Sequence, residues 1–234
     1  LSYFFVIAAL LNLNEKAFFH MDRPKSDGNI REGIAYAKAR PDIYVVMLMV
    51  FFLATFGLNF QIFNALMATK EFGKGPASYG LLGTYVAIGS LAGALISARL
   101  ERFRDSMLVV RLGAVFSLVV IATAFMPTYW TYSLWLPIGG VSALAMLISA
   151  NSYVLVKCDP AVRGRVMGIY LLIFMGGTPL GSLFIGYMTE AVGVRETIFI
   201  CGVIPLVAAT LLWVFFKDKL QKPDDLRVST ILKR

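Results

Sequence analysis

Long apolar runs, separated by short polar segments, constrain this 234-residue chain more than any other feature of its sequence. They cover about residues 1–13, 43–69, 75–98, 107–126, 133–156, 166–189 and 197–216. Each run except the first is about 20 residues or longer, which lets a helix cross the roughly 30 Å hydrocarbon core of a bilayer. The pattern therefore predicts an all-α integral membrane protein with six full spans.

Lysine and arginine gather on one side of these spans. If every run crosses the membrane, segments 12–42, 99–111, 157–165 and 217–234 share one face and carry 19 of the 22 Lys and Arg residues. The opposite face holds only Lys70, Lys74 and Arg195. The positive-inside rule places the first face, and with it the C-terminus, in the cytoplasm. Because topology explains the net charge of +8, we expect the lipid bilayer and not nucleic acid as a partner.

The composition agrees, since 58% hydrophobic residues with 15% charged residues exclude an ordinary soluble domain. The first run is short for a span and begins at Leu1 without a methionine, so we interpret it as the end of a longer helix and the chain as a fragment. The predicted organisation is the end of a transmembrane helix at 1–13, a cytoplasmic loop at 14–42, a six-helix bundle at 43–216 and a cytoplasmic tail at 217–234. Within the loop, Ile30, Ile34 and Ala37 share one face of a predicted amphipathic helix.

Several kinds of chemistry have no residues to carry them. The single histidine, His20, lies in a loop, so we predict no metal site, no cofactor and no catalytic residues, and the chain is not expected to be an enzyme. No Asp, Glu, Lys or Arg lies near the middle of any span. A proton relay ordinarily needs such a group. The acid of any proton relay must therefore lie outside this chain.

The first full span becomes polar in its outer half, where Asn59, Gln61 and Asn64 follow one another within six residues. Amide side chains at membrane depth are costly against lipid and should face the protein interior or a cavity. Two interpretations stay open. The amides line a cavity, or they form hydrogen bonds between helices that serve packing alone.

Glycines mark two other spans. Gly89 and Gly93 form a GxxxG pair, which lets another helix approach at backbone distance. The run 166–189 contains Gly177, Pro179 and Gly181 within an apolar stretch. This run is expected to form a kinked, closely packed helix, because neighbours must satisfy the backbone groups that proline frees.

Four segments together resemble one family: REGIAYAKARPDI, NFQ at 59–61, GSLAGALISARLERFR at 89–104, and DPAVRGRVMGIY followed by GGTPLGSLFIGY. The chain resembles the C-terminal half of a major facilitator superfamily transporter over essentially its whole length. It is most similar to the bacterial efflux branch that includes macrolide and enterobactin exporters. Relatives often carry a proline late in helix 7, where this chain has Ala65, which makes a break in that helix less secure.

The resemblance implies a proton-coupled antiporter of the bacterial inner membrane that exports a drug-like or siderophore-like molecule by alternating access. It also implies the N-terminal half of the same transporter as partner and places helices 8 and 11, with Gly89, Gly93, Gly177 and Gly181, near the interface between the halves. The predicted substrate-cavity residues are Asn59, Gln61, Asn64, Tyr85 and Asn151. The predicted cytoplasmic gate and loop residues are Arg99, Arg102, Arg104, Arg163 and Arg165. The predicted helix-packing and hinge residues are Gly89, Gly93, Gly177, Pro179 and Gly181.

Three other functions remain open from the sequence. The chain could be the membrane subunit of an ATP-driven transporter, because such subunits also have about six helices. It could be a half-size transporter that dimerises, because some transporters consist of two parallel six-helix repeats. A membrane-embedded enzyme is the third, and the sequence offers no catalytic constellation for it.

Overall fold

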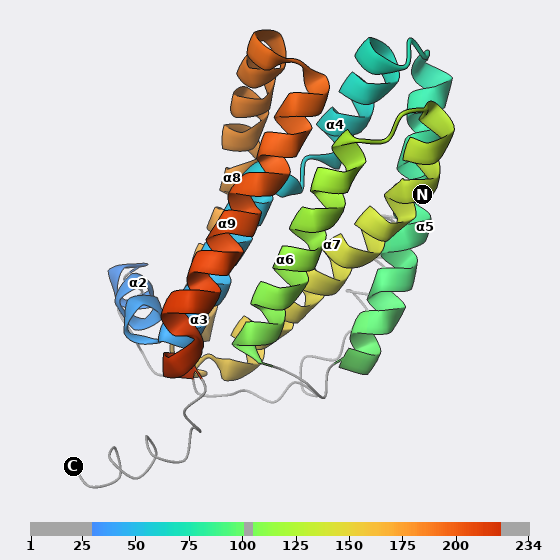
Figure 1. Ribbon diagram of the computed structural model, residues 1–234. Helices are drawn as coiled ribbons and strands as arrows, with labels where there is room; N and C mark the ends of the chain where they lie inside the picture. Colours follow the sequence, from blue (N-terminus) through green and yellow to red (C-terminus); the bar gives the residue numbers. More distant parts are fainter. Residues whose placement is uncertain (1–29, 101–104, 221–234) are drawn as a thin grey trace, which may run out of the picture.

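The computed structural model describes residues 30–100 and 105–220, and this part of the chain is helical without any strand (Figure 1). The end of a helix predicted at 1–13 and the tail beyond residue 220 lie outside the described residues. The helices follow in the order α2 (Ile30–Ala39), α3 (Pro41–Phe52), η2 (Leu53–Gly57), α4 (Phe60–Leu66), η3 (Met67–Glu71), α5 (Pro76–Leu100), α6 (Ser106–Ala124), α7 (Tyr129–Lys157), α8 (Arg163–Val192) and α9 (Val194–Leu220).

Six of the helical segments are long and apolar enough to span a membrane, which confirms the predicted fold class. They match the six full apolar runs and extend each of them by a few residues at one or both ends, except that Ser106–Ala124 stops just short of its predicted end. The extensions lie in polar sequence, because a helix keeps its backbone hydrogen bonds beyond the hydrocarbon core. Two of the starts carry N-caps. Asp105 accepts a hydrogen bond from the Met107 N–H, and Thr128 forms a capping box with Thr131.

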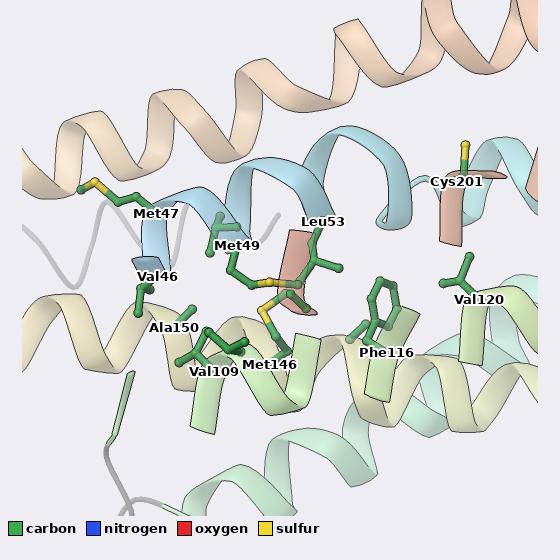
Figure 2. Close-up of a cluster of buried hydrophobic side chains, with 14 of the residues drawn as sticks. Val46, Met47, Met49, Leu53, Val109, Phe116, Val120, Met146, Ala150 and Cys201 are labelled. Atoms are coloured by element: carbon green, nitrogen blue, oxygen red, sulfur yellow. The ribbon is translucent and has the colours of Figure 1, made fainter. Parts of the chain in front are cut away.

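The first span, α3 to η3, lies at the centre of the bundle. Helix α3 packs against α6, α7, α8 and α9, while α5 pairs with α7, and α6 pairs with α9. Figure 2 shows Met49 of α3 and Leu53 of η2 among Phe116 of α6 and Met146 of α7, all fully buried. Burial falls off toward α5 and α8. In their most apolar stretches only 22% of residues are buried, against 61% in the first span.

The first span is interrupted near its middle, although Ala65 stands where relatives often carry a proline. The α-helix widens into the π-helical turn η2, and regular geometry stops at Leu58 and Asn59 before α4 begins. A π-turn inserts one residue into the hydrogen-bond ladder and so breaks a helix without proline. The break therefore lies some six residues earlier than the position of Ala65.

Helix α2 occupies the predicted amphipathic segment at the end of the bundle where α3 begins (Figure 1). We term this the basic end. Gly33 lies against α8, where a Cβ at Gly33 would come within 2.9 Å of the Ile169 side chain. Ile30 and Ile34, which share a predicted face with Ala37, are exposed, whereas Ala37 is buried. The helix thus packs on the bundle through its small residues and leaves its two isoleucines free to contact lipid.

Candidate functional site

The break in the first span concentrates polar groups inside the bundle. The Asn59 amide nitrogen donates to the Thr55 carbonyl oxygen at 2.9 Å, across the gap in the backbone ladder. The Asn59 amide oxygen and the Thr55 hydroxyl are buried, and neither has a hydrogen-bond partner within the described part of the chain. Other buried hydroxyls, such as those of Ser117 and Thr123, donate to carbonyls of their own helix. An unbonded buried polar atom costs free energy, and the break holds two of the four such side-chain atoms in the described part of the chain, the others being Arg163 Nε and Thr189 Oγ1.

Small residues of α8 cover the break. A Cβ at Gly181 would lie 1.7 Å from the Thr55 carbonyl oxygen, and one at Gly177 would lie 3.0 Å from the Thr55 hydroxyl. Pro179, between them, is exposed on the other side of α8. Only glycine allows this approach of helix to backbone.

The second glycine pair packs in a similar way on another helix. A Cβ at Gly89 would lie 2.0 Å from the Pro137 carbonyl oxygen, and one at Gly93 would lie 2.6 Å from that of Val141. Both residues belong to α7, so α5 and α7 meet at backbone distance. All four predicted packing glycines thus contact other helices of this same bundle and are not left open for a helix from outside it.

The remaining predicted cavity residues do not form one cluster. Asn64 is buried and accepts a hydrogen bond from the Tyr132 hydroxyl at 2.8 Å, while Gln61 is exposed. Tyr85 is half-buried against the core. Asn151 lies on α7, 19 residues from Tyr132, which corresponds to about 28 Å along a helix. The two ends of the predicted set are therefore too far apart to contact one small molecule together, and their role in a cavity stays a prediction.

Asn151 instead lines a pocket of about 300 Å³ between α7 and α8. The pocket opens to one side, and its lining residues are Leu147, Ile148, Asn151, Ser152, Tyr170, Leu171 and Phe174. Sequence reasoning identified only Asn151 among them. The others could not be assigned because nothing in the sequence says which faces of α7 and α8 diverge.

A charged cluster at the basic end was also missed. The Arg40 guanidinium forms two hydrogen bonds to the Asp42 carboxylate, at 2.9 and 2.7 Å, and the Tyr153 hydroxyl donates to the same carboxylate at 3.1 Å. The hydrogen bond to Asp42 raises the pKa of Arg40. The Tyr36 hydroxyl accepts from the backbone N–H of Asp159 at 3.1 Å. The cluster ties α2, α3 and the end of α7 together, and the Arg-Pro-Asp order at a helix start is the sequence feature that could have indicated it.

The described members of the predicted gate set lie at this same end. Arg165 forms an ion pair with Glu32 of α2. Arg163 donates to the Cys158 carbonyl oxygen at 3.4 Å, and Arg99 is exposed at the end of α5. Arg102 and Arg104 lie outside the described residues. The gating role of the set stays a prediction.

The opposite end has a tie of its own, made by Arg195 at the start of α9. Its guanidinium donates to the Glu71 carboxylate at 2.7 Å and to the carbonyl oxygens of Ala124 and Met126 at 2.9 and 2.8 Å. It also lies 5.8 Å from the centre of the Phe72 ring. Since α6 ends at these carbonyls, the arginine satisfies acceptors that the helix itself leaves free. Among the described residues, ionised side chains thus hold the two ends of the bundle and are absent from its middle.

This arrangement defines a helical-bundle membrane protein with a broken central span and a neutral polar interior. The sequence profile of the MFS_3 family, described as "Transmembrane secretion effector", matches residues 1–232. The chain belongs to this family of the major facilitator superfamily, and the predicted superfamily membership is confirmed.

Two curated relatives match parts of the chain at low identity. An uncharacterized MFS-type transporter of Enterobacter sp. (strain 638) is 24% identical over 107 residues, which is 45% of this chain and 28% of that protein. The uncharacterized MFS-type transporter YcaD of Escherichia fergusonii is 24% identical over 140 residues, 57% of this chain and 36% of the relative. The chain thus matches about a third of the length of these relatives.

Proposed function

We propose that this chain is the C-terminal six-helix half of a secondary active transporter of the drug and siderophore efflux branch. In this proposal an N-terminal half completes the molecule in a bacterial inner membrane, with the C-terminus in the cytoplasm. The two halves export a small molecule by alternating access, in exchange for protons. Because ionised side chains are absent from the middle of the spans described here, the proton-binding acid belongs to the other half.

The open faces of α5 and α8 carry this proposal. Gly80 and Gly83 of α5, and Gly176 and Gly186 of α8, have no neighbouring atom within 4 Å of the position that a Cβ would take. Large apolar side chains lie between them, such as Leu183, which is 75% exposed. A surface that alternates glycine with bulky apolar residues suits close packing against another helical bundle.

Alternating access requires each half to move as a unit, and the ties at both ends support this. The Arg40–Asp42 pair holds the start of α3 to α7 through Tyr153, and Arg195 holds the end of the first span to α6 and α9. A bundle fixed at both ends can rock without separating its helices. The break at Leu58–Asn59 leaves one place where the central span can bend.

Transport can be tested with bacterial cells that produce the complete transporter. Accumulation of a macrolide and of a catecholate siderophore is measured with and without a protonophore. We expect the transporter to lower the accumulation of at least one of them, and the protonophore to remove the difference. Equal accumulation in producing and non-producing cells for both compounds would argue against this efflux branch. A difference that survives the protonophore would argue against proton coupling.

The same open faces also fit a second copy of the chain, which makes a half-size dimeric transporter the second candidate. The variant Gly176→Cys distinguishes the half-size dimer from a transporter with both halves in one polypeptide. Val214→Cys is the control, because the Val214 side chain is exposed on α9. The protein is oxidised in native membranes and its mass is measured on a denaturing gel. A disulfide-linked dimer formed by Gly176→Cys, and not by Val214→Cys, would favour the half-size dimer. A monomer with either variant supports pairing with a second half of the same polypeptide.

A further inference from the structure

We propose that the pocket between α7 and α8 binds an uncharged, aromatic or polycyclic part of the transported molecule. This inference rests on the proposed transport function and adds the chemical class of the substrate. It assigns binding to Tyr170, Phe174, Asn151 and Ser152, three of which the sequence did not single out.

The position of the pocket suits a substrate site. Asn151 lies six residues before the end of α7, and Tyr170 lies seven residues after the start of α8, so the pocket is about 10 Å inside the basic end of the bundle. Helices α7 and α8 make few contacts with each other, and the pocket opens between them. A volume of about 300 Å³ lies at the lower end of the range for drug-sized ligands.

The polar groups of the pocket are not used by the fold. No hydrogen bond joins the exposed Asn151 amide or the hydroxyls of Ser152 and Tyr170 to another residue among 30–100 and 105–220. By contrast, Ser133 and Ser142, earlier on the same helix, donate to carbonyls one turn back. The three free groups offer both donors and acceptors at the edge of an otherwise apolar wall. They would orient a ligand that carries a few oxygen or nitrogen atoms on an apolar body.

The charge of the lining determines the class of ligand. Leucine, isoleucine, phenylalanine and tyrosine form most of the wall, and neither Asp, Glu, Lys nor Arg lines it. An ionised group placed there would lose hydration without gaining a counter-charge. The charges closest to the lining residues in sequence are cations, Lys157 and Arg165, which further disfavour a cationic ligand. The phenyl ring of Phe174 and the phenol of Tyr170 favour an aromatic body by stacking.

The proposal is tested by dye binding to the purified complete transporter in nanodiscs. The probes are Nile red, which is uncharged, ethidium, which is a cation, and 1-anilinonaphthalene-8-sulfonate, which is an anion. The first variant is Leu147→Trp, which fills the pocket, with Leu134→Trp as the control, because Leu134 is exposed on α7 and lies outside the pocket. We expect Nile red to bind at least tenfold tighter than either charged dye. Leu147→Trp should raise its Kd tenfold or more, and Leu134→Trp should change it less than twofold.

A second variant keeps the test open if Leu147→Trp does not fold. Ser152→Cys places a thiol in the pocket, and Ser182→Cys is a half-buried control on α8 beyond it. Alkylation by N-ethylmaleimide is followed by mass spectrometry of the separate peptides. Saturating Nile red should slow alkylation of Cys at 152 at least fivefold and leave that at 182 unchanged. Burial raises the pKa of the native Cys158 thiol, so its own reaction should be slow in every sample.

The outcomes separate this inference from the transport proposal. The pocket would be overturned if Leu147→Trp did not change Nile red binding and bound Nile red did not slow alkylation at residue 152. If the transporter still exported a tested compound, the transport function would be kept. Tighter binding of either charged dye at the same site would overturn the uncharged class. A third result is that Leu147→Trp loses Nile red binding while the transporter without the substitution exports none of the tested compounds. This result would support the pocket and count against the proposed efflux.

Discussion

The bundle contains two contacts built from the same pair of glycines four residues apart, and they differ in what the glycines meet. Gly89 and Gly93 of α5 press on α7, which is continuous from Tyr129 to Lys157. Gly177 and Gly181 of α8 press on the π-turn η2, where the central span is broken. The α5–α7 contact is also reciprocal, because a Cβ at Gly140 of α7 would lie 2.3 Å from the Val86 carbonyl oxygen of α5.

The difference shows that a glycine pair fixes the distance between two helices but not the stiffness of the contact. Helix α7 runs as one α-helix through the contact and lacks there only the backbone hydrogen bond that Pro137 cannot donate, so a displacement must move whole helices. The turn η2 has a widened ladder and two buried oxygen atoms without partners in the described part of the chain, those of Thr55 and Asn59. We infer that the α5–α7 contact serves stability, whereas the α8–η2 contact lies where the bundle can bend.

The largest expected effect is loss of stability at the rigid contact. Gly89→Val should lower the free energy of unfolding by about 3 kcal/mol, because its side chain would overlap the backbone of Pro137. Thermal unfolding in detergent, followed by tryptophan fluorescence, measures the change. Gly80→Val on the same helix is the control, since nothing lies within 4 Å of its Cβ position. Equal unfolding temperatures for the two variants would show that α5 and α7 do not meet at backbone distance.

Gly181→Ala should act on transport more than on stability. Its methyl group would displace the Thr55 carbonyl, and the loosened turn η2 can yield where an intact helix cannot. We expect transport to fall about tenfold in the complete transporter, with the unfolding temperature changed less than in Gly89→Ala. The control is Gly168→Ala near the start of α8, since nothing lies within 4 Å of its Cβ position. The reverse order, with Gly181→Ala the more unstable and still active, would contradict the assignment of the bend to this contact.

The overall fold could be predicted from the sequence because the periodicity of apolar runs against charge is strong over six spans. The position of the break could not. Without proline, only Gly57 and Asn59 differ from an ordinary apolar helix there, and a π-turn depends on contacts with α8 that are distant in the sequence. The residue type at one position, Ala65, made a break less secure in the prediction, although the helix is broken about six residues earlier.

The candidate site was harder to predict than the fold, for a physical reason. Asn64 and Asn151 have the same side chain at membrane depth, yet one is buried against Tyr132 and the other lines a pocket. Which of these occurs depends on whether a partner helix brings a hydroxyl opposite the amide, and sequence spacing along one helix contains no information about that. The charged pair Arg40 and Asp42 escaped notice because it lies two residues apart at a helix start, where charges are common.

The amides at the break are expected to have unequal effects. Asn59→Leu removes the hydrogen bond to the Thr55 carbonyl and should lower transport about fivefold, since the start of α4 loses its attachment to η2. Gln61→Leu, on the exposed side of α4, should lower transport less, unless Gln61 contacts the substrate or the other half. Membrane insertion, measured by the amount of protein in purified membranes, should be unchanged in both. Unchanged transport in both variants would remove the two residues from the site.

The smallest expected effect is a gain in stability at the break. Thr55→Val replaces the hydroxyl with a methyl group of similar size, and that hydroxyl is buried without a hydrogen-bond partner among the described residues. Relief of this burial should stabilise the protein by about 1 kcal/mol. Thr123→Val is the matched control, because the Thr123 hydroxyl is buried but donates to the Val119 carbonyl at 2.8 Å, so its removal should be neutral or slightly destabilising. Unfolding temperatures of the two variants, measured together, give the comparison.

A stabilised Thr55→Val with reduced transport would mean that the loosened turn is kept at a cost in stability because bending there is needed. A destabilised Thr55→Val would mean that the hydroxyl finds a partner in the complete transporter, and the break would then be a fixed feature of the bundle.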